Sequence, residues 1–178
     1  FSLDEDRYFA AYIQKYTLSK GIPRMTAALK RRFDESLGEI FANAVGHSQS
    51  RLGIFSCGQY FPRKNIFDFC LTDAGIGFRG SIHKEYGKWI PSTRAMRLCL
   101  SGDFTTKRNE PGGLGLKLLR QFIKLNKGRI VIVSNRAYFE FSSGSEETYL
   151  LDAPFPGTCV NLEINTADTA NYRLSSEF

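Results

Sequence analysis

Apolar residues recur at every third or fourth position in three stretches of the chain, which is the spacing of one face of an α-helix. The longest stretch covers 25–48 and predicts a long amphipathic helix. The same spacing predicts a shorter helix over 4–18, ended by Gly21 and Pro23, and another over 114–125. The apolar positions of the longest stretch are Met25, Leu29, Phe33, Leu37, Ile40, Phe41 and Ala44.

Strand-like apolar runs occupy the remaining chain on both sides of a glycine-rich segment, 74–111, in which one helix is predicted over 92–100. Two runs, 52–60 and 66–71, are separated by a short turn and predict a β-hairpin. Helices followed by consecutive strands indicate an α+β fold, with helices on one face of a largely antiparallel sheet. The later strand-like runs are 129–134, 137–141, 147–150 and 158–164, and the polar tail from Ala167 is expected to fray.

The length and composition indicate one folded domain, or one domain with an appendage, that has its own hydrophobic core. The chain has 178 residues, of which 42% are hydrophobic and 24% charged, which excludes disordered and collagen-like chains. No uncharged stretch is longer than the 11 residues of 52–62, whereas a membrane span needs about 20. The chain starts at Phe1 and charged residues follow where a signal peptide would be apolar. We therefore expect a cytoplasmic protein, cut from a longer chain or processed.

The four cysteines have no CxxC spacing and the chain has two histidines, so a zinc cluster is not expected. Three of the cysteines lie in strand-like runs, where a free thiol behaves as a small hydrophobic group. We expect buried, reduced thiols. The cysteines are Cys57, Cys70, Cys99 and Cys159.

Charge adds a preference for anionic partners, because 24 basic and 18 acidic residues give a net charge of +6. The only dense basic cluster is Lys30-Arg31-Arg32, within the long predicted helix. No RNP or zinc pattern accompanies it, so nucleic-acid binding has no support beyond charge.

A polar stripe flanks the apolar face of the long helix. Glu39, Asn43 and His47 are spaced four apart, so they share one side of the helix. Such a stripe can line a pocket, where Glu39 could polarise a water and the Asn43 amide oxygen could bind Mg²⁺. The alternative is that all three are ordinary surface residues.

Three glycine motifs follow along the chain. Asp73-Ala74-Gly75-Ile76-Gly77 ends a strand, and its glycines would let the backbone approach a ligand closely. Gly112-Gly113-Leu114-Gly115-Leu116 opens a helix and could cradle a phosphate, although it is neither a Walker A loop nor a Rossmann fingerprint. Gly157-Thr158 enters the last strand. Each motif alone could be a plain turn or a loop end.

In this order and at these separations, the motifs resemble those of the GHKL ATPase superfamily over about residues 25–166. That superfamily includes gyrase B, the ninety-kilodalton heat-shock chaperones, sensor histidine kinases and MutL proteins. The strings Glu39-Ile40-Phe41-Ala42-Asn43-Ala44 with His47-Ser48, and Thr105-Thr106-Lys107 ahead of Gly112, resemble in particular small bacterial histidine-kinase-like ATPase domains. The resemblance implies a Bergerat-type two-layer sandwich with a mixed, mostly antiparallel sheet and an ATP lid over about 78–111.

The resemblance also implies a role for each matching residue. Glu39 would activate the attacking water or a substrate hydroxyl, and Asn43 would bind Mg²⁺. Asp73 would accept the adenine amino group, supported by Thr158. Lys107 could reach the terminal phosphate, and the function of His47 stays open. The residues that would wrap the nucleotide and bind its phosphates are Gly75, Gly77, Gly112, Gly113, Leu114, Gly115 and Leu116.

We therefore expect an N-terminal helical extension at 1–24, an ATP-binding domain at 25–166 and a polar tail at 167–178. The expected function is binding of Mg-ATP and its hydrolysis to drive a conformational switch. The alternatives are a serine or histidine protein kinase of the anti-sigma-factor or sensor-kinase type, and a nucleotide-gated binding module without turnover. Expected partners are ATP or ADP and a further protein or domain. The segment 4–18 could pack on a second copy, forming a homodimer, or on its own sheet.

Overall fold

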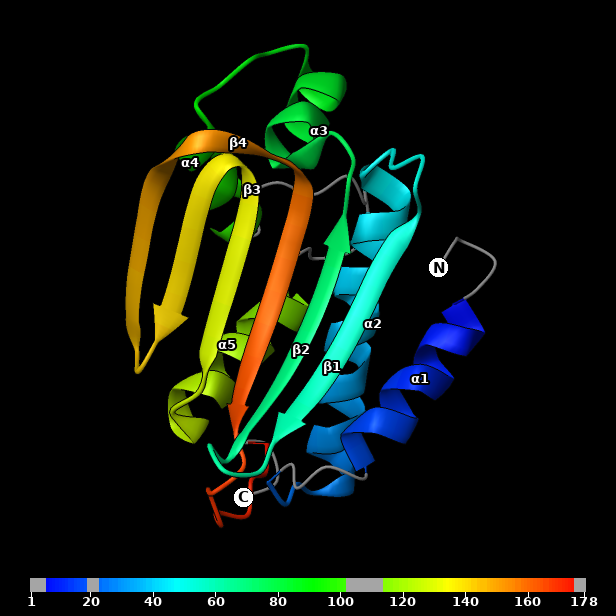
Figure 1. The fold of residues 1–178 in the computed structure, drawn as a ribbon, viewed down its shortest axis with the longest axis vertical. Helices are drawn as coiled ribbons and strands as arrows, with labels where there is room; N and C mark the ends of the chain where they lie inside the picture. Colours follow the sequence, from blue (N-terminus) through cyan, green and yellow to red (C-terminus); the bar gives the residue numbers. More distant parts are fainter. Residues whose placement is uncertain (1–5, 19–22, 102–113, 175–178) are drawn as a thin grey trace.

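A computed structural model describes residues 6–18, 23–101 and 114–174, which form an α+β fold (Figure 1). The α+β class and all the predicted helices and strands are confirmed, and one helix, α3, was not predicted. The elements in chain order are α1 (Asp6–Leu18), α2 (Ala27–His47), β1 (Ile54–Phe61), β2 (Ile66–Asp73), α3 (Gly77–Tyr86), α4 (Ser92–Ser101), α5 (Leu114–Asn126), β3 (Arg129–Ser142) and β4 (Ser145–Asn165).

The four strands form one sheet in the order β1-β2-β4-β3, and each neighbouring pair is antiparallel. The described sheet is therefore antiparallel throughout, where a mixed sheet was expected. Side chains alternate along β2: Phe67, Phe69 and Leu71 are buried, and the residues between them are half-buried. The buried side faces α2 and α5, which lie behind the sheet in Figure 1. The opposite side of the sheet is covered by no described helix.

The strands β3 and β4 are long because each joins two of the predicted runs through a bend. The pairing register shifts on both sides of Asn135, and Asn135 has a positive φ of 54°. Figure 1 shows β4 arching over the bent part of β3 before it runs down beside β2. The bend carries the second half of β3, with buried Phe139 and Phe141, onto the same core.

Helix α2 begins at an N-cap, since the Thr26 hydroxyl accepts a hydrogen bond from the Leu29 amide at 3.2 Å. Its predicted apolar stripe faces the core: Leu29, Phe33, Leu37 and Phe41 are buried, and the other members pack against them.

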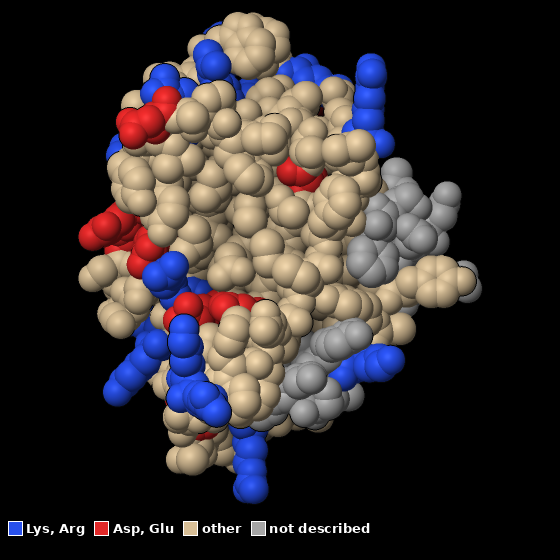
Figure 2. Space-filling view, in the orientation of Figure 1, with Lys and Arg blue, Asp and Glu red and all other residues tan. Residues whose placement is uncertain are grey.

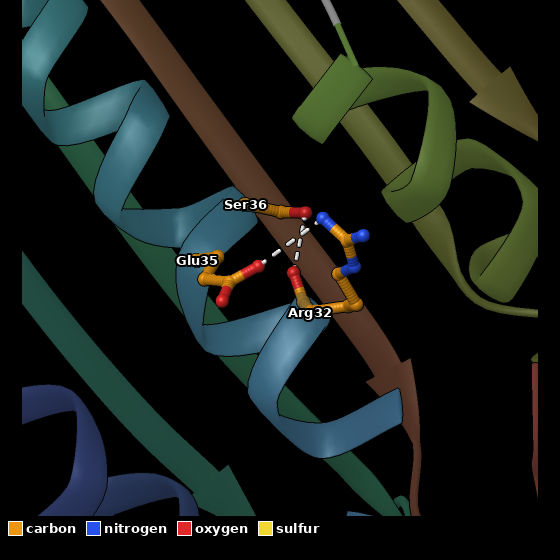
Figure 3. Close-up of polar contacts among 3 residues, drawn as sticks. All are labelled: Arg32, Glu35 and Ser36. Carbon is orange, nitrogen blue, oxygen red and sulfur yellow. Dashed lines mark hydrogen bonds and ion pairs between the residues drawn. The ribbon is translucent and has the colours of Figure 1, made fainter. Parts of the chain in front are cut away.

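The basic cluster on α2 is largely neutralised along the same helix. Lys30 pairs with Asp34 at 2.7 Å, and Arg32 reaches Glu35 at 3.5 Å while its carbonyl accepts from Ser36 (Figure 3). Two of its three charges therefore have acidic partners one turn away, which weakens the case for a nucleic-acid surface at this cluster.

Helix α1 packs on its own chain. Phe9 and Ile13 are buried in the main core, and the Phe9 ring stacks on Phe41 of α2 with a centroid separation of 4.0 Å. Segment 6–18 thus packs within its own chain, on α2 and on Phe69 of β2, and packing on a second copy stays a prediction.

The expected lid is only partly a loop. Residues 77–86 and 92–101 form α3 and α4, and Ala95 and Met96 of α4 are completely buried against the rest of the fold. Residues 102–111 lie outside the described part. Helix α3 was missed because Ile82 is its only large buried apolar side chain, so it has almost no apolar periodicity.

The expectation of a frayed tail is wrong for the described residues up to Leu174. Tyr172 is buried, its amide donates to the Arg24 carbonyl, and its carbonyl accepts from the Thr26 amide, both at 2.9 Å. The Tyr172 ring also packs edge-on against Phe122 of α5. Apolar burial and backbone hydrogen bonds thus hold the tail at the start of α2.

The expectation of buried thiols is also wrong. All four cysteines are free, Cys57 is exposed, and Cys70, Cys99 and Cys159 are half-buried. Separately, no helix in the described ranges has the length and apolar character needed to cross a bilayer.

Candidate functional site

The end of β2 meets β4, β3, the end of α2 and the start of α3. Asp73 is the last residue of β2, is 4% exposed, and lies opposite Thr158 of β4 in the strand register. Its Oδ1 accepts the Gly75 amide at 2.8 Å, which closes a tight turn directly after the strand. The predicted motifs at Asp73 and Thr158, 85 residues apart, are therefore adjacent in space.

Two glycines allow the backbones at this junction to approach closely. A Cβ at Gly75 would lie 1.9 Å from the Ser48 carbonyl oxygen, and the next amide, of Ile76, donates to that same oxygen at 2.7 Å. Gly157 has a φ of 85°, and a Cβ there would lie 2.2 Å from the Asp73 carbonyl oxygen and 2.5 Å from its Oδ1. Because glycine has no side chain, the loop after β2 can lie directly against the end of α2 and against β4.

The third glycine, Gly77, is the first residue of α3 and also has a positive φ, 66°. A Cβ there would lie 2.6 Å from the Asn135 side chain. All three glycines that the sequence marked near Asp73 and Thr158 are thus at positions that a larger residue would disturb.

Two residues that the sequence did not indicate, Ser134 and Asn135 of β3, cap the start of α3. The Ser134 hydroxyl accepts the Phe78 amide and lies 2.9 Å from the Thr158 hydroxyl. The Asn135 side chain accepts the Arg79 amide and donates to the Ile76 carbonyl, both at 3.0 Å. They satisfy amides that α3 cannot bond within itself. Their signal was a polar pair ending the apolar run 130–133, which also occurs at ordinary strand ends.

Burial raises the pKa of the Asp73 carboxyl, and the amides of Gly75 and Thr158 partly oppose this by donating to it. A carboxylate has about four acceptor positions, and these two amides occupy two of them. A buried carboxylate held rigidly in this way suits recognition of a planar donor such as an exocyclic amino group.

The polar stripe of α2 runs back from this junction. The carbonyl of His47 accepts a weak hydrogen bond from Ser81 of α3 at 3.4 Å, and His47 itself is half-buried. Asn43 and Glu39 are exposed and lie one and two turns earlier, about 6 and 12 Å along the axis. The stripe therefore leads away from the junction along α2.

A magnesium site at Asn43 stays a prediction. In the described part of the chain, no group of three or more His, Cys, Asp or Glu side chains could hold a metal by itself. Asn43 offers one amide oxygen, and Mg²⁺ commonly takes few protein ligands and completes its shell with phosphate oxygens and water.

The glycine motif at 112–116 lies only partly within the described residues. Lys107, Gly112 and Gly113 lie outside the described residues, and Leu114, Gly115 and Leu116 form the first turn of α5. Helix α5 packs beside α2 and on β3, with Leu116 against the core. The phosphate-binding role of this motif stays a prediction.

No protein-family model matches the sequence, and a search of curated proteins finds no significant match.

Proposed function

We propose that this protein binds Mg-ATP at the junction of β2, β4 and α2 and hydrolyses it to drive a conformational switch, as in GHKL ATPases. The observation that carries the proposal is the convergence of separate motifs. Asp73, Gly75, Gly77 and Thr158 meet at the end of the helix that carries Glu39 and Asn43. The resemblance rests on the order of these motifs, and their adjacency in space is an independent property.

Each residue then has a defined task. Asp73 accepts the adenine amino group, while the Ser134–Thr158 hydroxyl pair keeps its surroundings polar and rigid. Asn43 contributes one ligand to Mg²⁺, which when bound neutralises charge on the phosphate oxygens. Glu39, one turn from Asn43, orients the attacking water and accepts its proton.

Nucleotide affinity tests the adenine assignment. We expect Asp73→Asn to weaken ATP binding by about 10- to 100-fold, because a hydrogen bond to a charged group is worth about 1.5–3 kcal/mol. The measurement is isothermal titration calorimetry with ATP and Mg²⁺. Asp152→Asn, at an exposed position of β4, is the matched control and should bind as the parent does. Equal affinities for the parent and Asp73→Asn would contradict the assignment.

Phosphate release tests the catalytic assignment. We expect Glu39→Gln to hydrolyse ATP about 10²- to 10⁴-fold more slowly while still binding it, since that is the range for a positioned general base. Glu35→Gln, one turn earlier on α2 and paired with Arg32, is the control. Unchanged hydrolysis in Glu39→Gln would remove Glu39 from catalysis. Phosphate transfer to an added protein, or tight binding without turnover, would instead favour a kinase or a nucleotide-gated binding module.

A further inference from the structure

Three of the four cysteines lie on the side of the sheet that faces away from the helices. Cys57 of β1 is directly opposite Cys70 of β2 in the register, and Cys159 of β4 is opposite Thr72, two positions from Cys70. The three positions alternate with buried core residues such as Leu71 and Val160. Figure 2 shows mainly uncharged side chains over the middle of this face.

Two of these thiols are already close to bonding distance. The Sγ atoms of Cys70 and Cys159 are 3.5 Å apart and in hydrogen-bond contact. A disulfide needs about 2.05 Å, so the sulfurs must approach by about 1.5 Å for the bond to form. Both residues are half-buried, so a small oxidant can reach them from the open face.

The two sulfurs differ in reactivity. The contact with the Cys70 thiol, opposed in part by burial and by the Asp73 charge, lowers the pKa of Cys159 to about 7, which favours its thiolate. The same contact with Cys159, together with burial, raises the pKa of Cys70, which therefore keeps its proton. Cys99, on α4, has its pKa raised to about 12 by burial alone.

We propose that Cys159 and Cys70 form a dithiol site that a hydroperoxide oxidises to a disulfide, with Cys159 as the attacking thiol and Cys70 as the resolving thiol. This inference does not depend on the proposed function.

The reaction balances with hydrogen peroxide as the oxidant. The Cys159 thiolate attacks one peroxide oxygen, the O–O bond breaks, hydroxide leaves, and the sulfur becomes a sulfenic acid. The Cys70 sulfur then attacks the Cys159 sulfur as it loses its proton; the S–S bond forms, the S–O bond breaks and water leaves. In total, two thiols and one peroxide give one disulfide and two waters. The bond would join β2 to β4, three residues from Asp73 in β2 and one residue from Thr158 in β4.

Peptide mapping of the oxidised full chain identifies the bond, because trypsin places each cysteine in a different peptide. Cys70 falls in 65–79 and Cys159 in 137–173, while Cys57 and Cys99 fall in 52–63 and 98–107. The reduced protein is treated with one equivalent of hydrogen peroxide at neutral pH, alkylated and digested. We expect the peptides 65–79 and 137–173 to be linked, and an intact mass lower by two hydrogen atoms.

Single substitutions separate the roles. Cys159→Ser should lower the rate of peroxide-dependent thiol loss by at least about tenfold, and Cys70→Ser should stop at a sulfenic acid on Cys159 that dimedone traps. Cys57→Ser and the control Cys99→Ser should still form the disulfide. In the parent, Cys159 should react with iodoacetamide at least about tenfold faster than Cys99.

Several results would overturn the proposal. They are a linkage of 52–63 to 65–79 in place of the expected pair, absence of any linked peptide in the parent, or equal alkylation rates for Cys159 and Cys99. Because the peptide map and the alkylation rates are measured on the parent protein, they decide the matter even if a serine variant folds poorly.

Discussion

At the scale of single residues, two glycines show how strongly local geometry decides the effect of one methyl group. Gly157 has a φ of 85° and faces the Asp73 backbone at a distance that excludes any side chain. Gly38, in the middle of α2, has ordinary helical geometry and nothing within 4 Å of its added Cβ. The same substitution should therefore have opposite effects at the two positions.

We expect Gly157→Ala to lower the free energy of unfolding by roughly 2–4 kcal/mol, because both the positive φ and the contact with Asp73 oppose a Cβ. Gly38→Ala should raise it by about 0.5–1 kcal/mol, since alanine is the better helix former. Urea unfolding followed by circular dichroism measures both. Equal unfolding midpoints for the parent and Gly157→Ala would show that β4 can move away from Asp73 without loss of stability.

At the scale of elements, periodicity predicted the segments whose apolar residues face one core. Helix α2 and strand β2 match their predictions because burial follows their periods of 3.6 and 2 closely. Helix α3 was not predicted, because it lacks apolar periodicity and because its first amides are bonded by Ser134 and Asn135, more than fifty positions away. A contact of that separation leaves no pattern in the local sequence.

Some residues of the candidate site could likewise be predicted from the sequence, and others could not. Asp73, Gly75, Gly77 and Thr158 could be predicted because each is a special residue at the end of a recognisable element. Ser134 and Asn135 could not, since their role depends on the bend of β3, which the sequence shows only as two separate apolar runs. The sequence thus predicted the motif residues, and the structure identified the residues that hydrogen-bond to them.

The packing of α1 on α2 predicts how substitutions in α1 change stability. We expect Phe9→Ala to lower the free energy of unfolding by about 3–4 kcal/mol, because the ring is 2% exposed and stacks on Phe41. Tyr8→Ala, at a neighbouring position that is 70% exposed, should change it by less than about 0.5 kcal/mol. Urea unfolding compares the two variants. A similar loss for both would mean that α1 contributes little through its contact with α2.

At the scale of the whole molecule, one apolar cluster joins α1, α2, α4, α5 and all four strands. Tyr172 is the last buried residue of this cluster. Its backbone hydrogen bonds to Arg24 and Thr26 hold the segment after β4 beside the residues that precede α2. The segment after β4 is therefore packed on the rest of the fold, although its sequence is polar.

We expect Tyr172→Ala to lower the free energy of unfolding by about 2–4 kcal/mol, because it removes a buried ring from Phe122 and a hydroxyl that donates to Asp168. Asn171→Ala, at the preceding exposed position, should change it by less than about 0.5 kcal/mol. Both are measured by urea unfolding, with intrinsic fluorescence and circular dichroism as separate probes. If the ends fold together with the core, the two probes give one midpoint in each variant. A separate early transition in the parent would instead show that the tail and the start of α2 form a less stable unit.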